Sequence, residues 1–223
     1  MVNPDMRTIV SGFVIADVTL TLFMIMAVTQ NHRRFMGIRS WMVTFFLQNL
    51  AVLLIVLRGF IPDWMSIVLS NTMLIAGMLT GLRGICSFTQ VKLNLIPDYL
   101  SIILLVFLQA WFTFVDLNLS VRSLNLSVAM LIFSGQYIWV VFYKAGKNMR
   151  RLAGAIGIIF TGYALVNIIR IIHFFTNHLT TDDYFQADSF EKAVFIAYQV
   201  LFIFLAYGLS LMYTRWMLTE IAN

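Results

Sequence analysis

The sequence has little charge, one cysteine and few prolines. Of its 223 residues 11% are charged, Cys86 is the single cysteine, and the three prolines are Pro4, Pro62 and Pro97. A soluble domain usually carries about 25% charged residues, so this composition excludes an ordinary soluble domain. One cysteine cannot form a disulfide within the chain. The prolines fall at or beyond the expected helix ends, which argues against the broken helices that many transporters use.

Long apolar runs fill most of the chain instead. Apolar residues make up 61% of it, and the mean hydropathy is +0.87. A helix needs about 20 predominantly apolar residues to cross a bilayer. Seven runs satisfy this, and they predict an all-α bundle of seven transmembrane helices at residues 8–30, 41–60, 66–88, 97–116, 125–143, 153–176 and 191–214. We expect one membrane domain over residues 1–217, with the start of a linker at 218–223.

The basic residues predict the direction of these helices. With the N-terminus outside, the cytoplasmic side holds nine of them (Arg33, Arg34, Arg39, Lys92, Lys144, Lys147, Arg150, Arg151 and Arg215) and the outer side three (Arg7, Arg122 and Lys192). Cytoplasmic loops carry the excess of Lys and Arg, so this distribution predicts an outer N-terminus and a cytoplasmic C-terminus. The net charge of +5 is therefore attributed to topology, and no nucleic-acid partner is expected.

Polar side chains inside the predicted spans indicate a binding site. Arg58 lies near the outer end of the second span and Asn71 lies early in the third, both near the outer surface. In the sixth span Tyr163, Asn167, Arg170, His173 and Asn177 are spaced by 4, 3, 3 and 4 residues, which places them on one helix face. Ionisable groups in a span usually face the bundle interior. We therefore predict a pocket open to the outer side, lined by Arg58, Asn71, Asn167, Arg170, His173 and Tyr198.

The chemistry of the two arginines favours an anionic ligand. Neighbouring guanidinium groups repel each other unless an anion bridges them, and Arg binds a carboxylate or phosphate with two parallel hydrogen bonds. The 20 Phe and 13 Met residues would make a cavity apolar and adaptable, so the ligand is expected to be small, amphipathic and anionic. A purely structural role stays open: Arg58 can pair with Asp63 or lipid headgroups, and Arg170 with Asp17 or Glu191.

Several chemistries are not expected. A retinal Schiff base requires a lysine in the middle of the last span, whereas Lys192 lies at its outer end. No phosphate-binding loop, hydrolase motif or metal-ligand pattern occurs in the sequence, and Asp17 is the single acid deep in a span. We therefore expect no enzymatic activity in this chain and neither a cofactor nor a metal.

Three segments carry a resemblance to a known family. They read RFMGIRSW (34–41), LRGFIPDWMSIVLSN (57–71) and GLRG (81–84). Together they resemble the N-terminal membrane sensor region of bacterial GGDEF proteins, the diguanylate cyclases, and the close match covers about residues 33–90. Beyond it the likeness is in architecture: seven spans and an arginine in the sixth.

The resemblance implies a function. It implies a sensor domain in the bacterial inner membrane, whose last helix relays ligand binding to a cytoplasmic effector that makes cyclic-di-GMP and works as a dimer. The chain carries no GGDEF domain, so residues 218–223 would lead into a missing effector and the cyclase activity would belong to the parent protein. Two alternatives stay open. One is a small-solute transporter with a polar path through Asp17, Gln48, Gln109 and Gln136; the other is a ligand-free anchor that dimerises an effector.

Overall fold

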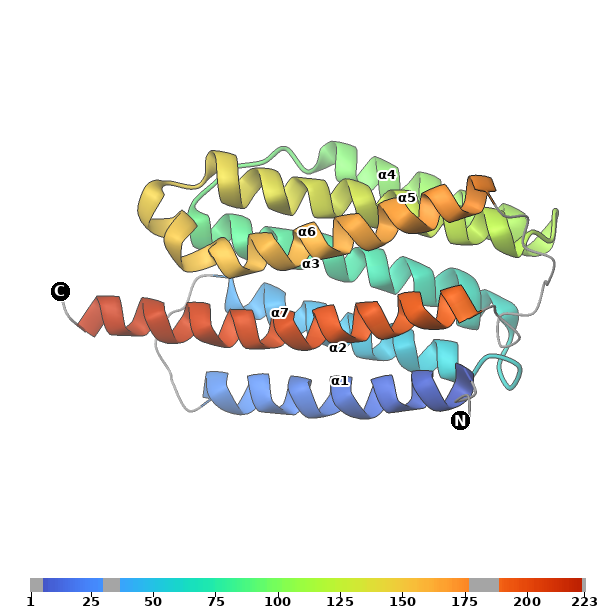
Figure 1. Ribbon diagram of the computed structural model, residues 1–223, viewed down its shortest axis with the longest axis horizontal. Coiled ribbons are helices and arrows are strands. Elements are labelled where there is room, and N and C mark those ends of the chain that lie inside the picture. The colour runs from blue at the N-terminus through green and yellow to red at the C-terminus, as the bar shows by residue number, and fades with distance from the viewer. Residues whose placement is uncertain (1–5, 30–36, 177–188, 222–223) are drawn as a thin grey trace.

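The chain folds into a bundle of long helices (Figure 1). The computed structural model describes residues 6–29, 37–176 and 189–221. Seven α-helices occupy these residues: α1 Met6–Thr29, α2 Ile38–Val56, α3 Ser70–Thr89, α4 Ile96–Phe114, α5 Leu119–Trp139, α6 Lys147–Thr176 and α7 Ser189–Ile221. Two short π-helical segments extend them, with η1 (Trp64–Leu69) leading into α3 and η2 (Val140–Lys144) following α5.

The helices lie along a common axis, and neighbours in sequence run in opposite directions (Figure 1). As a result α1 begins at one end of the bundle and α7 ends at the other. The last helix is the longest, with 33 residues, and its C-terminal part extends past the other helices in Figure 1. It continues to Ile221, beyond the expected end of the seventh span at residue 214.

Over the described residues, six helical segments are long and apolar enough to cross a membrane: Ile38–Val56, Trp64–Thr89, Ile96–Phe114, Ser120–Lys144, Lys147–Thr176 and Ser189–Thr219. In α1 the described residues give a shorter apolar stretch, Ser11–Leu22. Large apolar side chains such as Phe60, Phe107 and Phe175 are mostly exposed, which suits contact with lipid rather than water. The predicted all-α membrane fold is thus confirmed at this level, while the count of seven spans and their direction stay predictions.

Two glycines of α3 allow it to pack closely against α2 and α5. Gly77 and Gly81, the Gly-x-x-x-Gly pair of the sequence, face the interior: a Cβ on Gly77 would touch Gln48, and one on Gly81 would overlap the Tyr137 hydroxyl. That hydroxyl donates a 2.9 Å hydrogen bond to the Met78 carbonyl. The two small residues therefore serve packing within the bundle, as in other membrane helices that approach closely.

Replacing Gly81 with valine should destabilise the bundle by about 1–3 kcal/mol, because the added methyl groups displace Tyr137 from a filled interior. The matched control is Gly135→Ala on α5, where a Cβ would meet no atom within 4 Å and helix propensity favours Ala. Thermal unfolding in detergent should show a lower midpoint for Gly81→Val alone. Equal midpoints for both variants would contradict this account of the contact.

Candidate functional site: a cavity with a cationic rim

A cavity of about 140 Å³ lies inside the bundle and is lined by side chains from α1, α2, η1, α3, α5, α6 and α7. Since one water needs roughly 10–15 Å³ by this kind of measure, the space is about ten times what a single water requires. Its wall is mostly apolar, with few charged groups. An apolar pocket with a few convergent polar groups is the usual form of a small-molecule site.

Among the residues that the structure describes, the charged ones that line the cavity are all near one end of the bundle. We call this group the cationic rim; it consists of Arg58, Arg122, Arg170 and Glu191. Arg58 follows the end of α2, and Arg122 and Glu191 lie in the first turns of α5 and α7. Arg170 lies in the last two turns of α6. Because neighbouring helices alternate in direction, these four positions come to the same end. Three guanidinium groups and one carboxylate give the rim a formal charge of +2.

Local chain signals place two of these arginines. The Asn118 side chain accepts a 3.1 Å hydrogen bond from the Val121 backbone amide and caps α5, as Asn commonly does at a helix start. Arg122 follows in the first turn. Beyond Arg58 the chain turns at Gly59, whose φ of 90° is a left-handed conformation that glycine adopts without strain.

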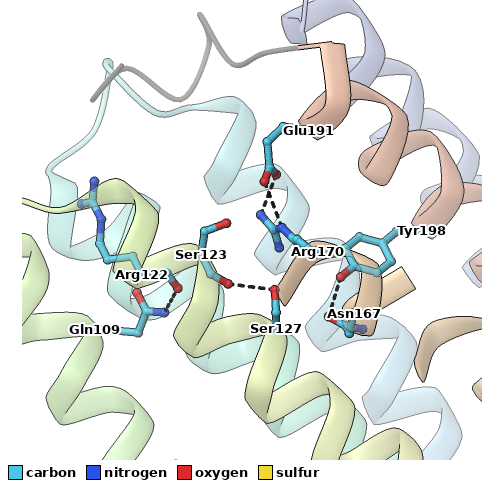
Figure 2. A network of polar contacts seen from close by, with 8 residues as sticks. All are labelled: Gln109, Arg122, Ser123, Ser127, Asn167, Arg170, Glu191 and Tyr198. Atoms are coloured by element: carbon cyan, nitrogen blue, oxygen red, sulfur yellow. Dashed lines mark hydrogen bonds and ion pairs between the residues drawn. The ribbon is translucent and has the colours of Figure 1, made fainter. Parts of the chain in front are cut away.

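Arg170 and Glu191 form a buried ion pair between α6 and α7 (Figure 2). Nε of Arg170 donates to Oε1 of Glu191 at 3.1 Å, and Nη2 donates to Oε2 at 2.7 Å. The exposed fractions of the two side chains are 7% and 10%. This is the two-bond geometry in which Arg holds a carboxylate most tightly. Of the two structural partners considered for Arg170, the structure therefore selects Glu191 rather than Asp17.

Further polar contacts continue from this pair along the same helices. The Tyr198 hydroxyl lies beside Arg170 and donates a 2.8 Å hydrogen bond to Oδ1 of Asn167, as Figure 2 shows. The Asn167 amide nitrogen donates to the Tyr163 carbonyl at 2.8 Å. Each of these contacts either joins α6 to α7 or orients a side chain that does. The two helices are therefore connected by hydrogen bonds as well as by the ion pair.

A second set of hydrogen bonds connects α3, α4 and α5 beneath Arg122. The Asn71 amide nitrogen donates to Oε1 of Gln109 at 3.3 Å. The Gln109 amide nitrogen donates in turn to the Arg122 carbonyl at 3.0 Å (Figure 2). Gln109 is fully buried. Its two bonds fix the first turn of α5, and with it the backbone from which the Arg122 side chain extends.

Toward the opposite end the cavity is lined by three neighbouring aromatic rings, which we call the aromatic floor: Trp41, Tyr137 and Phe160. The Tyr137 and Phe160 rings stack with centroids 3.5 Å apart, and the Trp41 and Tyr137 centroids are 6.2 Å apart. All three side chains are almost fully buried. The cavity therefore has a charged end and an aromatic end.

The structure places four of the six predicted site residues in the cavity wall: Arg58, Asn71, Arg170 and Tyr198. The other two lie outside the lining. Asn167 is fully buried and supports Tyr198, while the His173 ring stacks on Phe190 at a centroid distance of 3.8 Å. A shared face of α6 therefore did not separate the residues that line the cavity from those that lie behind its wall.

Arg122 was not among the predicted site residues. The fifth span was expected to begin at residue 125, so Arg122 was counted as a residue of the outer loop; the helix begins at Leu119. The Asn118 cap, which has a sequence signature, was the available signal. The aromatic floor had no comparable signal, since Phe and Trp are frequent throughout the chain.

Asp17 lies outside the cavity lining and is 1% exposed. Neither of its carboxyl oxygens accepts a hydrogen bond within the part of the chain that the structure describes. No group of three or more His, Cys, Asp or Glu residues is arranged to hold a metal ion over residues 6–29, 37–176 and 189–221. The arginines are the side chains best suited to bind a charged molecule.

The bond between Tyr198 and Asn167 can be tested directly. Tyr198→Phe leaves the buried Asn167 oxygen unsatisfied, so the free energy of unfolding should fall by about 1–3 kcal/mol. Tyr207→Phe on the same helix is the matched control, because Tyr207 is 63% exposed. Thermal or chemical denaturation of both variants measures the difference. If the two variants unfold alike, the bond contributes nothing to the α6–α7 contact.

The fold and cavity together define a class: a helical bundle of the multi-pass membrane type with an internal, mostly apolar cavity that is positively charged at one end. Comparison with protein families, with curated proteins and with solved structures finds no match. Nothing in these comparisons identifies a sensor region of GGDEF proteins, so that resemblance stays a prediction.

Proposed function

We propose that the chain is a seven-span sensory domain that binds a small amphipathic anion in the cavity and relays binding through α7. The observation that carries the proposal is the shared lining: Arg58 of the chain after α2 and Arg170 of α6 border one cavity whose remaining wall is mostly apolar. Such a wall favours an apolar body, and the +2 rim favours an anionic head.

The relay rests on α7. Glu191, Tyr198 and Phe202 of this helix border the cavity, and the same helix extends past the bundle at its other end (Figure 1). A ligand that contacts these side chains differently in two positions of α7 shifts the balance between those positions. In this proposal the rim faces outward, the far end of α7 is cytoplasmic, and a dimeric effector of the diguanylate cyclase type follows it in a bacterial inner membrane.

The alternatives have less support. Of the four residues required for a polar transport path, Gln48 lines the cavity, whereas Asp17, Gln109 and Gln136 do not. Gln109 is bonded to Arg122, and Gln136 donates a 2.5 Å hydrogen bond to Asp98. A ligand-free anchor would have no need of an internal cavity with buried charges, which are costly to keep in a membrane interior.

The test uses two amphipathic anions, decanoate and naphthoate, and spin labels at Leu218→Cys on α7 and Tyr143→Cys on η2 in a Cys86→Ala background. Both label sites are exposed. At least one probe should bind and change the distance between the labels. Saturable binding without a distance change would contradict sensing, and transport of the probe into proteoliposomes would favour the transporter.

Mass spectrometry of the purified protein provides an independent result. An amphipathic anion should be released when the wild-type protein is denatured. It should be depleted in Leu126→Trp, which fills the cavity, but retained in Val128→Trp, whose side chain is on the same helix and 40% exposed. Equal amounts of the compound from both variants would place its binding elsewhere.

A further inference from the structure

The shape of the cavity narrows the class of ligand. On the α2 side it is bordered by Trp41, Thr44, Gln48, Val52, Ile55 and Arg58. From Trp41 to Ile55 the spacings of 3, 4, 4 and 3 residues describe one continuous face of α2, and Arg58 follows after the helix ends at Val56. At 1.5 Å per residue, the distance from Trp41 to Ile55 is about 21 Å, and Arg58 lies beyond it. A volume of about 140 Å³ distributed along that length is narrow, so the cavity suits a thin, extended molecule better than a compact one.

Polarity changes along this length. One end is the cationic rim and the other is the aromatic floor, with apolar residues such as Leu74, Leu126 and Met130 between them. The polar side chains in the middle are engaged within the protein. Gln48 donates to the Leu74 carbonyl at 3.2 Å, and Thr44 donates to the Ser40 carbonyl at 2.9 Å. The middle of the cavity therefore presents mainly hydrocarbon surface to a ligand.

Within the rim, Arg170 already binds a carboxylate. It holds the Glu191 carboxylate with two hydrogen bonds, and the rim also contains the guanidinium groups of Arg58 and Arg122. A planar carboxylate matches the guanidinium fork in the same manner. The head group of the ligand is therefore expected to be a carboxylate that binds beside an existing Arg–carboxylate pair.

We propose that the cavity binds a single unbranched alkyl carboxylate, with its head at Arg58 and Arg122 and its tail directed toward the aromatic floor. The inference rests on the proposed function and specifies its ligand. A phospholipid has two acyl chains, for which a narrow cavity gives no room. A fused-ring anion such as naphthoate has the charge but not the shape.

The experiment measures binding of a homologous series, from hexanoate to hexadecanoate, to the full chain in nanodiscs, with empty nanodiscs as the blank. Affinity should rise about fourfold per added methylene, equivalent to about 0.8 kcal/mol. The rise should stop at the length at which the tail reaches the floor. Primary alcohols of equal length should bind at least about tenfold more weakly, because they lack the charge.

Matched variants locate the tail. Met130→Trp narrows the cavity and should move the plateau to shorter chains, whereas Val128→Trp on the exposed side of the same helix should leave it unchanged. Leu126→Phe, a smaller change in the same wall, provides the same readout if Met130→Trp does not fold. If Met130→Trp or Leu126→Phe folds and its affinity stops rising at the same chain length as in the wild-type protein, the placement of the tail is overturned.

Other outcomes separate this inference from the proposed function. If naphthoate binds and the affinity of the alkyl carboxylates does not depend on their chain length, the alkyl ligand is overturned and the sensor proposal stands. Displacement of decanoate by phosphatidylglycerol at equal affinity would make the occupant a membrane lipid and would also overturn it. If neither decanoate nor naphthoate binds, both proposals fail.

Discussion

Glu191→Leu is expected to lower the free energy of unfolding by about 3–5 kcal/mol, because it leaves the guanidinium of Arg170 buried without its carboxylate. Both side chains are almost fully enclosed, so bulk solvent is largely kept from the guanidinium group that loses its two hydrogen bonds. Denaturation monitored by tryptophan fluorescence or circular dichroism in detergent measures this loss.

Two controls make the result specific. Asp63→Leu removes an exposed carboxylate at the same end of the bundle and should change stability by no more than about 1 kcal/mol. The double variant Arg170→Met, Glu191→Leu removes both charges and should recover much of the loss, because a buried ion pair is often replaceable by apolar groups of similar volume. A double variant as unstable as Glu191→Leu would mean that the destabilisation has another origin.

Arg58→Gln is expected to weaken decanoate binding by roughly 10–100-fold, the equivalent of about 1.5–3 kcal/mol for a hydrogen bond to a charged group. Arg58 lines the cavity and is partly buried, so its interaction with a carboxylate is only partly screened by solvent. Adding Arg122→Gln should weaken binding further, since both positive charges of the rim beyond the Arg170–Glu191 pair are then gone. Equilibrium dialysis with nanodisc-embedded protein gives the dissociation constants.

Arg83→Gln is the matched control for this prediction. Arg83 is an exposed arginine of α3 that lies over the Tyr99 ring at 5.0 Å and is absent from the cavity wall. Its replacement should leave binding unchanged. Equal binding by Arg58→Gln and the wild-type protein would remove the arginine from the site and support its purely structural role.

The sequence predicted the helices well because each needs an uninterrupted apolar run. The expected span 66–88 corresponds to Trp64–Thr89 in the structure, and 97–116 to Ile96–Phe114. The fifth helix was predicted six residues too short at its start, where residues 119–124 are too polar to resemble a membrane segment. The Asn118 cap and the hydrogen bond from Gln109 of α4 to the Arg122 carbonyl stabilise that turn. Such tertiary contacts are not visible in local hydropathy.

The candidate site was predictable in part, for a related reason. Charged and amide side chains are rare in a span, so Arg58, Asn71 and Arg170 were conspicuous in the sequence, and all three line the cavity. Position along a helix also gave the depth of each residue. It did not give the rotation of α6, which turns His173 toward Phe190 rather than into the cavity. Nor could it show which of several aromatic residues close the far end, because that depends on how α2, α5 and α6 pack together.

The unusual length of α7 has a mechanical consequence. Its 33 residues form a rod of about 50 Å, joined to α6 by Glu191 and Tyr198 near one end and packed in the core as far as Met212. A small tilt of such a rod about its packed part displaces the C-terminal end sideways. In the proposed relay, a rearrangement of a few side chains at the Glu191 end would therefore reach Ile221 as a lateral movement, without any change in the helix itself.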